Sequence, residues 1–250
     1  MSELVVPNIV IESVAYKDKV FNLVQDTYLP AGTKQRGWKF FRDLARQGYT
    51  EIATYGTVYG FGQVATAWCC RQVGLRCTLF LPYTNPRTVM TEQAISYGAN
   101  IIDVSDNRYV STIMLEERVA QYMKESPPTT KFIKLGLDDP GFVTYLAEGI
   151  KESWHSPLPR RIWLAGGSGV LARALAKAFP GVRLFIVQVG RELYVDMLDG
   201  IDYVKFVNPQ PFPENTTIVP PYPSLLHYDA KVWRFAREYG KNDDYIWNVK

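Results

Sequence analysis

Residues 51–82 read EIATYGTVYGFGQVATAWCCRQVGLRCTLFLP. A short apolar run, Glu51 to Thr54, opens this stretch, a segment with helical spacing follows from Gln63 to Val73, and a second apolar run extends from Arg76 to Leu81. Glycines crowd the loop before the helix (Gly56, Gly60 and Gly62). A strand, a loop, a helix and a second strand in this order form a βαβ unit. The stretch therefore predicts a parallel sheet with helices packed on it.

The same alternation extends over most of the chain. Strands are predicted at residues 8–12, 20–24, 51–54, 76–81, 100–104, 131–134, 161–165, 182–189 and 203–207. Helices are predicted at residues 34–47, 63–73, 88–97, 112–124, 140–154 and 170–179, with a last amphipathic segment at 228–239. Residues 207–224, VNPQPFPENTTIVPPYPS, interrupt this pattern with six prolines and are interpreted as a functional loop or an extended surface arm. The predicted fold class is α/β, with mostly parallel sheets flanked by helices.

Composition narrows the class of protein. The chain has 250 residues, 47% of them hydrophobic, and its 28 basic and 25 acidic side chains give a net charge of +3. These values exclude a disordered or collagen-like chain. The sequence lacks both an apolar run of roughly 18 residues, as a membrane helix needs, and a secretory signal. Three cysteines and two histidines suit neither a disulfide framework nor a zinc site, so no metal is expected, and the expected compartment is the cytoplasm.

Ligands bind at the carboxyl ends of strands in open parallel sheets, so the junctions between strands and helices are the candidate sites. In AGTKQRGWKFF, residues 31–41, Lys34 stands at the predicted start of a helix. A helix N-terminus disfavours an added positive charge. A lysine whose amine is pushed toward neutrality can form a Schiff base with a carbonyl compound. The commoner interpretation of Lys34 alone is a solvated side chain.

A second junction lies in IWLAGGSGVLARALA, residues 162–176. Here a predicted strand runs into Gly166, Gly167, Ser168 and Gly169 before a helix, an arrangement typical of a phosphate cup at a helix N-terminus. Two other interpretations are a purely structural turn and a weak dinucleotide fingerprint. The next predicted strand ends at Gln188, Val189 and Gly190, without the acidic residue that would bind a ribose, which argues against the fingerprint.

The sequence resembles the fold-type II pyridoxal-phosphate enzymes, the family of the tryptophan synthase β-subunit. The resemblance lies in three motifs that follow one another in the family's order: GTKQR, residues 54–82 and AGGSGVLA. The resemblance covers most of the chain. It implies a two-lobed fold, with residues 1–38 and 131–250 as a large cofactor-binding lobe and residues 39–130 as a small lobe covering the cofactor. It also implies that pyridoxal 5′-phosphate is bound to Lys34 as a Schiff base. Gly166, Gly167, Ser168 and Gly169 would surround the phosphate, and the loop of Gly60 and Gly62 would cover the cofactor face.

Within the family, the pattern is most similar to the aminocyclopropane-carboxylate deaminase and D-cysteine desulfhydrase branch. Thr54 and Gly56 match the opening of its cofactor-face loop, and HYDAKVW, residues 227–233, is similar to a segment near its C-terminus. This match implies that Tyr228 lies beside the substrate and Asp229 at the pyridine nitrogen. A carboxylate there keeps the ring protonated, so that it accepts the electrons of a broken bond at Cα. The alternative is that the two residues cap the last helix.

The sequence also departs from the family. Gly60, Phe61 and Gly62 stand where its members usually carry Ser and Asn side chains that contact the ring and assist catalysis. This difference argues against a plain aminocyclopropane-carboxylate deaminase. Compact versions of the fold with an ending like PPYPS followed by HYDAKVW are similar to viral enzymes that act on amino acids attached to DNA bases.

The expected function is that of a pyridoxal-phosphate lyase activating Cα of an amino acid, by decarboxylation, deamination or elimination. Lys34 would be the general base or acid and Tyr228 a second proton carrier. One alternative is a lyase or decarboxylase acting on an amino acid conjugated to a nucleotide or DNA base, in the host cytoplasm. Another is a non-catalytic module that binds pyridoxal phosphate or a nucleotide. The expected partners are the amino-acid substrate, or an amino-acid-modified nucleotide, and a second copy in a homodimer, with no membrane.

Overall fold

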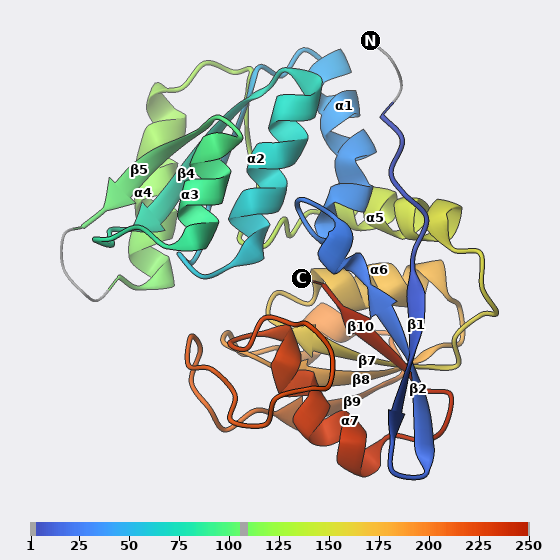
Figure 1. Ribbon diagram of the computed structural model, residues 1–250. Helices are drawn as coiled ribbons and strands as arrows, with labels where there is room; N and C mark the ends of the chain where they lie inside the picture. Colours follow the sequence, from blue (N-terminus) through green and yellow to red (C-terminus); the bar gives the residue numbers. More distant parts are fainter. Residues whose placement is uncertain (1–3, 106–109, 250) are drawn as a thin grey trace. The chain divides into compact units, whose positions relative to one another are not determined.

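The computed structural model describes residues 4–105 and 110–249, which fall into two compact units (Figure 1). One unit comprises residues 34–145, and the other combines the residues up to 33 with those from 146 onward. The boundary falls inside helix α5 (Pro140–Ser153). The division into lobes at residues 39 and 130 stays a prediction.

The unit of residues 34–145 is built on a sheet of four strands that are all parallel, in the order β5-β4-β3-β6. The strands are β3 (Glu51–Tyr55), β4 (Arg76–Pro82), β5 (Ala99–Val104) and β6 (Thr130–Phe132). The 3₁₀ helix η2 (Thr33–Gly37) leads into α1 (Trp38–Arg46), and the other helices are α2 (Phe61–Val73), α3 (Val89–Ser96) and α4 (Thr112–Glu125). Helices α2 and α3 lie on one face of the sheet and α4 on the other (Figure 1).

The alternation of side chains along the strands determines this packing. In β3, Ala53 and Tyr55 point to the face where Leu115 and Val119 of α4 bury their side chains. Fully burying one large apolar side chain contributes roughly 1.5–3 kcal/mol. The apolar residues of α4 are spaced three to four apart and those of β3 two apart. Both sets therefore point into the same buried layer.

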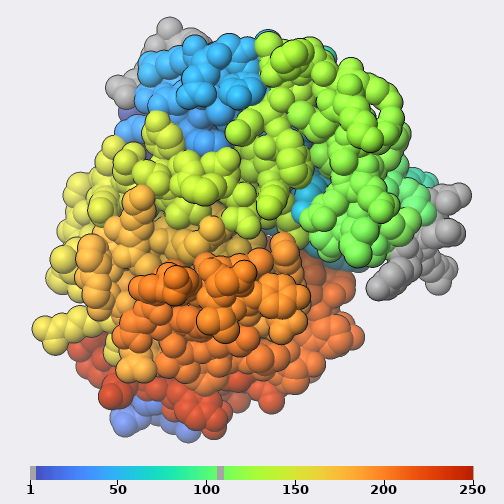
Figure 2. Space-filling view, turned by 180° about the vertical axis from the view of Figure 1, so that it is seen from behind, coloured from blue at the N-terminus to red at the C-terminus, as the bar shows by residue number. Residues whose placement is uncertain are grey.

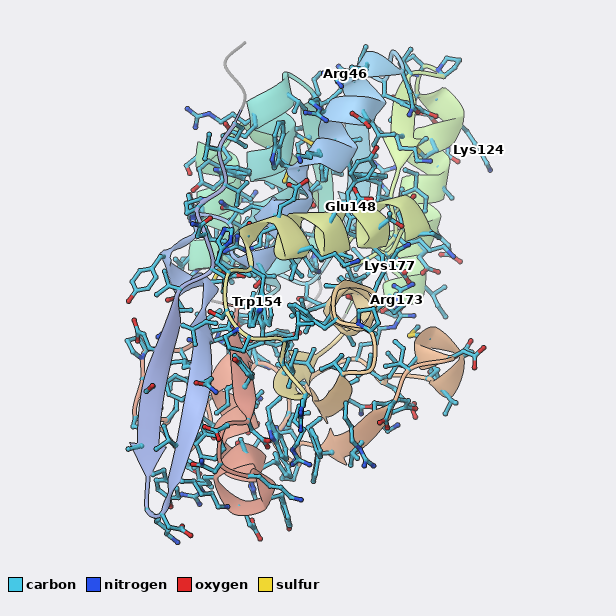
Figure 3. The ribbon with its side chains drawn as sticks, turned by 90° about the vertical axis from the view of Figure 1, so that its right-hand side faces the viewer. Arg46, Lys124, Glu148, Trp154, Arg173 and Lys177 are labelled. Carbon is cyan, nitrogen blue, oxygen red and sulfur yellow. The ribbon has the colours of Figure 1, made fainter. Side chains whose placement is uncertain are left out.

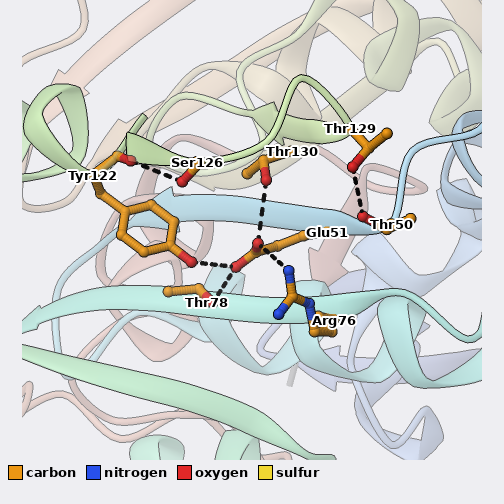
Figure 4. A network of polar contacts seen from close by, with 8 residues as sticks. All are labelled: Thr50, Glu51, Arg76, Thr78, Tyr122, Ser126, Thr129 and Thr130. Carbon is orange, nitrogen blue, oxygen red and sulfur yellow. Dashed lines mark hydrogen bonds and ion pairs between the residues drawn. The ribbon is translucent and has the colours of Figure 1, made fainter. Parts of the chain in front are cut away.

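A polar network joins the strands of this sheet around the buried carboxylate of Glu51, which is 1% exposed (Figure 4). The carboxylate accepts hydrogen bonds from Thr78 at 2.6 Å, Tyr122 at 2.7 Å and Thr130 at 3.2 Å, and it pairs with Arg76 at 2.9 Å. Each buried oxygen is thus matched by donors, as a buried charge requires.

The other unit is built on six strands in the order β1-β2-β10-β7-β8-β9, with only β1 and β2 antiparallel. Their bounds are β1 (Ile11–Tyr16), β2 (Lys19–Gln25), β7 (Arg161–Gly166), β8 (Arg183–Gln188), β9 (Tyr203–Val207) and β10 (Tyr245–Asn248). Two α-helices, α6 (Val170–Ala178) and α7 (Trp233–Tyr239), accompany them, with the 3₁₀ helices η1 (Asp26–Tyr28), η3 (Val195–Leu198) and η4 (Asp229–Val232). Residues 190–210, orange in Figure 2, reach the surface of this unit.

Large aromatic rings fill the core of the six-stranded unit. Trp163 and Trp233 are buried in one cluster. Trp154, labelled in Figure 3, follows α5 and stacks on Trp247 of β10 with the ring centroids 6.2 Å apart. Many of the aromatic side chains of the sequence are therefore core residues, each burying a large apolar area.

The predicted fold class and most predicted elements are confirmed. Strand β1 begins three residues later than predicted, because it follows the register of its hairpin partner β2. The predicted helix at 34–47 was wrong at its start, where residues 33–37 form a 3₁₀ helix. The predicted helix at 228–239 likewise begins as η4. The four-residue strand β10 was missed because its pattern is too short to be recognised.

Within residues 4–105 and 110–249, no helix is long and apolar enough to cross a membrane. The same ranges contain no group of three or more His, Cys, Asp or Glu side chains placed to hold a metal ion. Cys69, Cys70 and Cys77 are free and buried, and burial raises the pKa of the Cys69 and Cys70 thiols. These two thiols are therefore protonated and act as small apolar side chains.

Candidate active site

Lys34 lies in the first turn of η2 and directs its amine to the loop after β6. Its Nζ donates a hydrogen bond of 2.6 Å to the Gly136 carbonyl oxygen. A Cβ placed on Gly62 would lie 3.8 Å from this Nζ and 3.6 Å from the Gly136 Cα. A Cβ alone would fit there, whereas a longer side chain would crowd the amine. Gly62 therefore keeps the space beside Lys34 open, within the unit of residues 34–145.

The loop between β3 and α2 is held by side chains that the sequence analysis did not single out. The Gln63 amide nitrogen donates to the carbonyl oxygens of Thr57 at 3.1 Å and Val58 at 2.9 Å. The Thr88 hydroxyl also donates to the Val58 carbonyl, at 2.5 Å. Because three hydrogen bonds from two side chains fix two successive carbonyls, the loop has a defined shape although it is rich in glycine.

Gly60 is the N-cap residue of α2 and has a specific steric reason to be glycine. A Cβ at this position would lie 2.9 Å from the Thr57 hydroxyl oxygen and 3.4 Å from the Thr57 carbonyl oxygen. The Thr57 side chain thus occupies the space that a side chain at position 60 would need. A hydroxyl at position 57 is a polar group of this loop that the sequence analysis missed.

The loop of Gly166 to Gly169 connects β7 to α6 and brings the backbone close to its neighbours. A Cβ on Gly166 would lie 2.5 Å from Ile186 Cγ2 and 2.7 Å from Leu193 Cδ1, so a larger residue would separate β7 from β8. Gly169 is the N-cap of α6, with φ 73°, a conformation that favours glycine. Gly167 and Ser168 between them are partly exposed. Packing thus explains Gly166 and backbone conformation explains Gly169, and the two partly exposed residues between them directly precede the N-terminus of α6.

The Tyr228 hydroxyl lies beside this glycine loop. A Cβ added to Gly167 would lie 3.4 Å from the Tyr228 Oη, and the Tyr228 ring packs edge-on against Phe212, with centroids 6.1 Å apart. Burial and the charge of Asp229 raise the pKa of the Tyr228 phenol far above its ordinary value. At neutral pH the phenol is therefore protonated and able to donate a hydrogen bond.

Asp229 opens η4 and is 2% exposed. A second phenol is close enough to feel its charge, because burial and Asp229 together also raise the pKa of Tyr222. The N-cap of α7 is Val232, and neither η4 nor α7 has a side-chain cap. Tyr228 is itself the N-cap residue of η4 and Asp229 lies in its first turn, so the alternative that the two residues cap the last helical segment stays open.

The proline-rich arm of residues 207–224 is tied to the same unit. Lys231 of η4 is fully buried, and its Nζ donates to the Pro211 carbonyl oxygen at 3.0 Å. Burial lowers the pKa of Lys231, with Glu214 acting in the opposite direction. The Asn248 amide of β10 donates to the Pro223 carbonyl oxygen at 2.7 Å, so the arm is held to this unit at a second position.

The structure thus gathers the predicted site residues in two groups. The unit of residues 34–145 brings Lys34 to Gly62 and adds Gly136, which the sequence analysis missed. The other unit brings Tyr228 to Gly167, with Asp229 as the residue following Tyr228. Tyr222 was also missed, although an aromatic residue between two prolines in PPYPS is a signal that could have identified it. The chemical roles of all these residues stay predictions.

Comparison with known proteins gives a match at the level of structure alone. Neither a protein-family model nor a curated protein matches the sequence. Among solved structures, an ACC deaminase homologue matches with a TM-score of 0.73 and 16% identity, over 92% of this chain and 83% of that chain. A pyridoxal 5′-phosphate-dependent aspartate racemase has a TM-score of 0.54 and 16% identity, covering 92% of this chain and 69% of that one. Threonine deaminase isoform 2 from Solanum lycopersicum has a TM-score of 0.63 and 13% identity, with coverages of 92% and 75%.

At these identities the likeness establishes the fold. The chain has the fold of the fold-type II pyridoxal-phosphate enzymes, so the fold predicted from the three motifs is confirmed. Fold alone does not determine activity, which has to be argued from the site.

Proposed function

We propose that the chain is a pyridoxal-phosphate-dependent enzyme that breaks a bond at Cα of an amino-acid substrate. The cofactor would be carried on Lys34 as a Schiff base, with its phosphate at Gly166, Gly167, Ser168 and Gly169. One observation carries the proposal: Lys34 and the glycine loop, both singled out from sequence, follow the carboxyl ends of β2 and β7 in a fold shared with such enzymes. When bound, the cofactor supplies a ring that accepts the electron pair of the broken bond.

The residues present suit this cofactor chemically. A phosphate needs backbone N–H groups and a helix N-terminus, which the loop before α6 offers. Tyr228 adds a protonated hydroxyl beside Gly167. Asp229 is a buried carboxylate that can accept a hydrogen bond from a protonated ring nitrogen. Gly62 places no side chain against the Lys34 amine, which a Cβ at this position would approach to 3.8 Å.

Lys34 is the group that would move the proton at Cα. Its amine is oriented by a hydrogen bond of 2.6 Å to the Gly136 carbonyl oxygen. The carbonyl orients the amine while leaving its lone pair available once a proton is lost.

Tyr228 is better suited to donating a hydrogen bond than to removing a proton. Its pKa lies far above neutrality because of burial and the nearby charge of Asp229. Each unit of pKa mismatch costs about 1.4 kcal/mol in proton transfer. We therefore infer that Tyr228 stabilises an anionic oxygen at the glycine loop, instead of the proton carrier role first assigned to it.

The direct test is the visible absorbance of the purified chain after incubation with pyridoxal phosphate. The proposal predicts an absorbance band that is lost in Lys34→Ala. Lys39→Ala is the matched control, because Lys39 lies one turn further along, on α1, and its variant should keep the band. An unchanged spectrum in Lys34→Ala would contradict the proposal.

The reaction is identified by the products. Free amino acids and aminoacylated thymidine are offered in parallel, and carbon dioxide and ammonia are assayed. Product from free amino acids supports the amino-acid lyase. Product from the conjugate alone supports the lyase on a modified nucleotide, and cofactor uptake without any product supports a non-catalytic binding module. The homodimer stays a prediction.

A further inference from the structure

Tyr222 is a buried phenol whose oxygen has no hydrogen-bond partner among the described residues. The residue is 7% exposed and its ring packs edge-on against Trp233, with centroids 5.8 Å apart. Nearly all buried polar atoms in native proteins are paired, because an unpaired one forfeits its hydrogen bonds to water. An unpaired buried hydroxyl therefore needs a reason.

Loose packing of the arm does not provide that reason. The backbone next to Tyr222 is fixed by the hydrogen bond from Asn248 to the Pro223 carbonyl. The Ser224 hydroxyl donates to the Asn248 side-chain oxygen at 2.7 Å. Prolines on both sides of Tyr222 restrict the backbone further. The phenol is held in place, and its oxygen is left unpaired within a rigid setting.

The neighbour that defines the chemistry is Asp229. Burial and the charge of this carboxylate raise the pKa of Tyr222, so the phenol is a hydrogen-bond donor. An ionised carboxylate only accepts hydrogen bonds. A donor and an acceptor near one another are complementary to a ligand that carries an acceptor and a donor on one small ring. A protonated pyridine with a ring oxygen has this pattern.

We propose that Tyr222 is a ligand-binding residue whose hydroxyl donates a hydrogen bond to the ring oxygen of the pyridine compound that Asp229 binds. This inference rests on the proposed function, because it takes the ligand to be a pyridine phosphate. It adds a residue from the proline-rich arm to the site. The arm is thereby part of the binding site and not only a surface connection.

The experiment measures binding to the full chain by tryptophan fluorescence, since Trp233 contacts Tyr222. The probes are pyridoxal phosphate, pyridoxine phosphate, a pyridine phosphate without the ring hydroxyl, and inorganic phosphate. We expect Tyr222→Phe to weaken the first two by about tenfold, the value of one hydrogen bond to a charged group. Binding of the compound without the hydroxyl and of phosphate should not change. The melting temperature should not fall, because the removed hydroxyl was unpaired.

Tyr245→Phe is the matched control. Tyr245 is 8% exposed in the same unit, and its hydroxyl donates to the Pro157 carbonyl oxygen at 3.3 Å. Its variant should lower the melting temperature and leave every affinity unchanged.

The outcomes separate the two proposals. If the wild-type chain binds no pyridine compound, the proposed function is wrong. If it binds them and Tyr222→Phe binds all four probes as well as the wild type, the inference about Tyr222 is wrong while the proposed function stands. An equal weakening of all four probes, or a lower melting temperature, would show a purely structural role and also contradict the inference.

Discussion

Two buried carboxylates, Glu51 in one unit and Asp229 in the other, differ in whether the tyrosine hydroxyls near them form hydrogen bonds. Glu51 is 1% exposed and Asp229 is 2% exposed, and each lies near tyrosine hydroxyls. The Tyr122 hydroxyl donates to Glu51 at 2.7 Å. The Tyr222 hydroxyl near Asp229 has no partner within the described ranges. The first carboxylate belongs to a closed network, whereas the second lies near a phenol that is unpaired among the described residues.

Under the proposed function, the difference separates a carboxylate that stabilises the fold from a carboxylate that would bind the cofactor. A closed network such as that of Glu51 connects three strands and α4, so its loss is felt in stability. A buried hydrogen-bonding group without a partner lowers the stability of the free protein. A ligand that pairs with this group restores the lost stability. Buried polar groups left unpaired in a native structure therefore indicate function more reliably than buried charge alone.

The largest expected effect is on stability, in Glu51→Gln. The amide removes the charge that pairs with Arg76 and turns two N–H donors toward the hydroxyls that now donate to Glu51. We expect the free energy of unfolding to fall by about 3 kcal/mol, measured by urea denaturation. A loss below about 1 kcal/mol would contradict the view that this network is a main stabilising element.

Asp229→Asn should show the opposite pattern. We expect pyridoxal phosphate to bind about 10 to 100 times more weakly, because a charged hydrogen bond worth roughly 1.5–3 kcal/mol is lost. The free energy of unfolding should stay within about 1 kcal/mol of the wild type, since burying a neutral amide is less costly than burying a charge. Titration of each variant with the cofactor and urea unfolding of the free chain measure the two quantities. Unchanged affinity would remove Asp229 from the site.

The two tyrosines allow a closely matched comparison. Tyr122→Phe removes a hydroxyl that donates to a buried carboxylate and should cost about 1.5–3 kcal/mol of unfolding free energy. Tyr222→Phe removes an unpaired hydroxyl and should cost nothing or stabilise the chain slightly. Thermal and urea unfolding of the two variants, measured side by side, test this difference. Equal losses in both variants would mean that the contrast between the networks is wrong.

The smallest effect concerns pH. Burial acts to raise the pKa of Glu51, but the hydrogen bonds from Thr78 and Tyr122 and the charge of Arg76 outweigh it and lower the pKa below its ordinary value of 4.5. A carboxyl with a lower pKa in the folded chain stabilises the fold above its unfolded pKa, and this contribution is lost as the pH falls through the folded pKa. The wild type should therefore lose stability as the pH falls from above 4.5 to below it, and Glu51→Gln should lose less over the same range. Urea midpoints over this range measure the difference, and equal losses would exclude Glu51 as the source.

Much of the fold could be predicted because local patterns and tertiary structure agree. In β3, β4 and α2 the apolar spacing of the sequence matches the observed elements within two residues. Strand β10 could not be predicted, because it has four residues and is stabilised by pairing with β2 and β7, which are distant in sequence. Its burial comes from tertiary context, which a local pattern does not contain.

The site was predicted in part for a similar reason. Lys34 and the glycines of residues 166–169 stand out because their residue types conflict with ordinary helix and strand preferences. Gly136 contributes a backbone carbonyl, which any residue could supply, so no residue type marks it. Tyr222 becomes a candidate only when burial and hydrogen bonding are known together, and the sequence contains neither.

The proposed function requires that Lys34 carries pyridoxal phosphate. Borohydride reduction of the chain after incubation with the cofactor, followed by peptide mapping, tests it most directly, because reduction makes the Schiff base permanent. We expect a pyridoxyl group on the peptide that contains Lys34. A chain that takes up the cofactor but carries the label only on other lysines, or carries none, would contradict it.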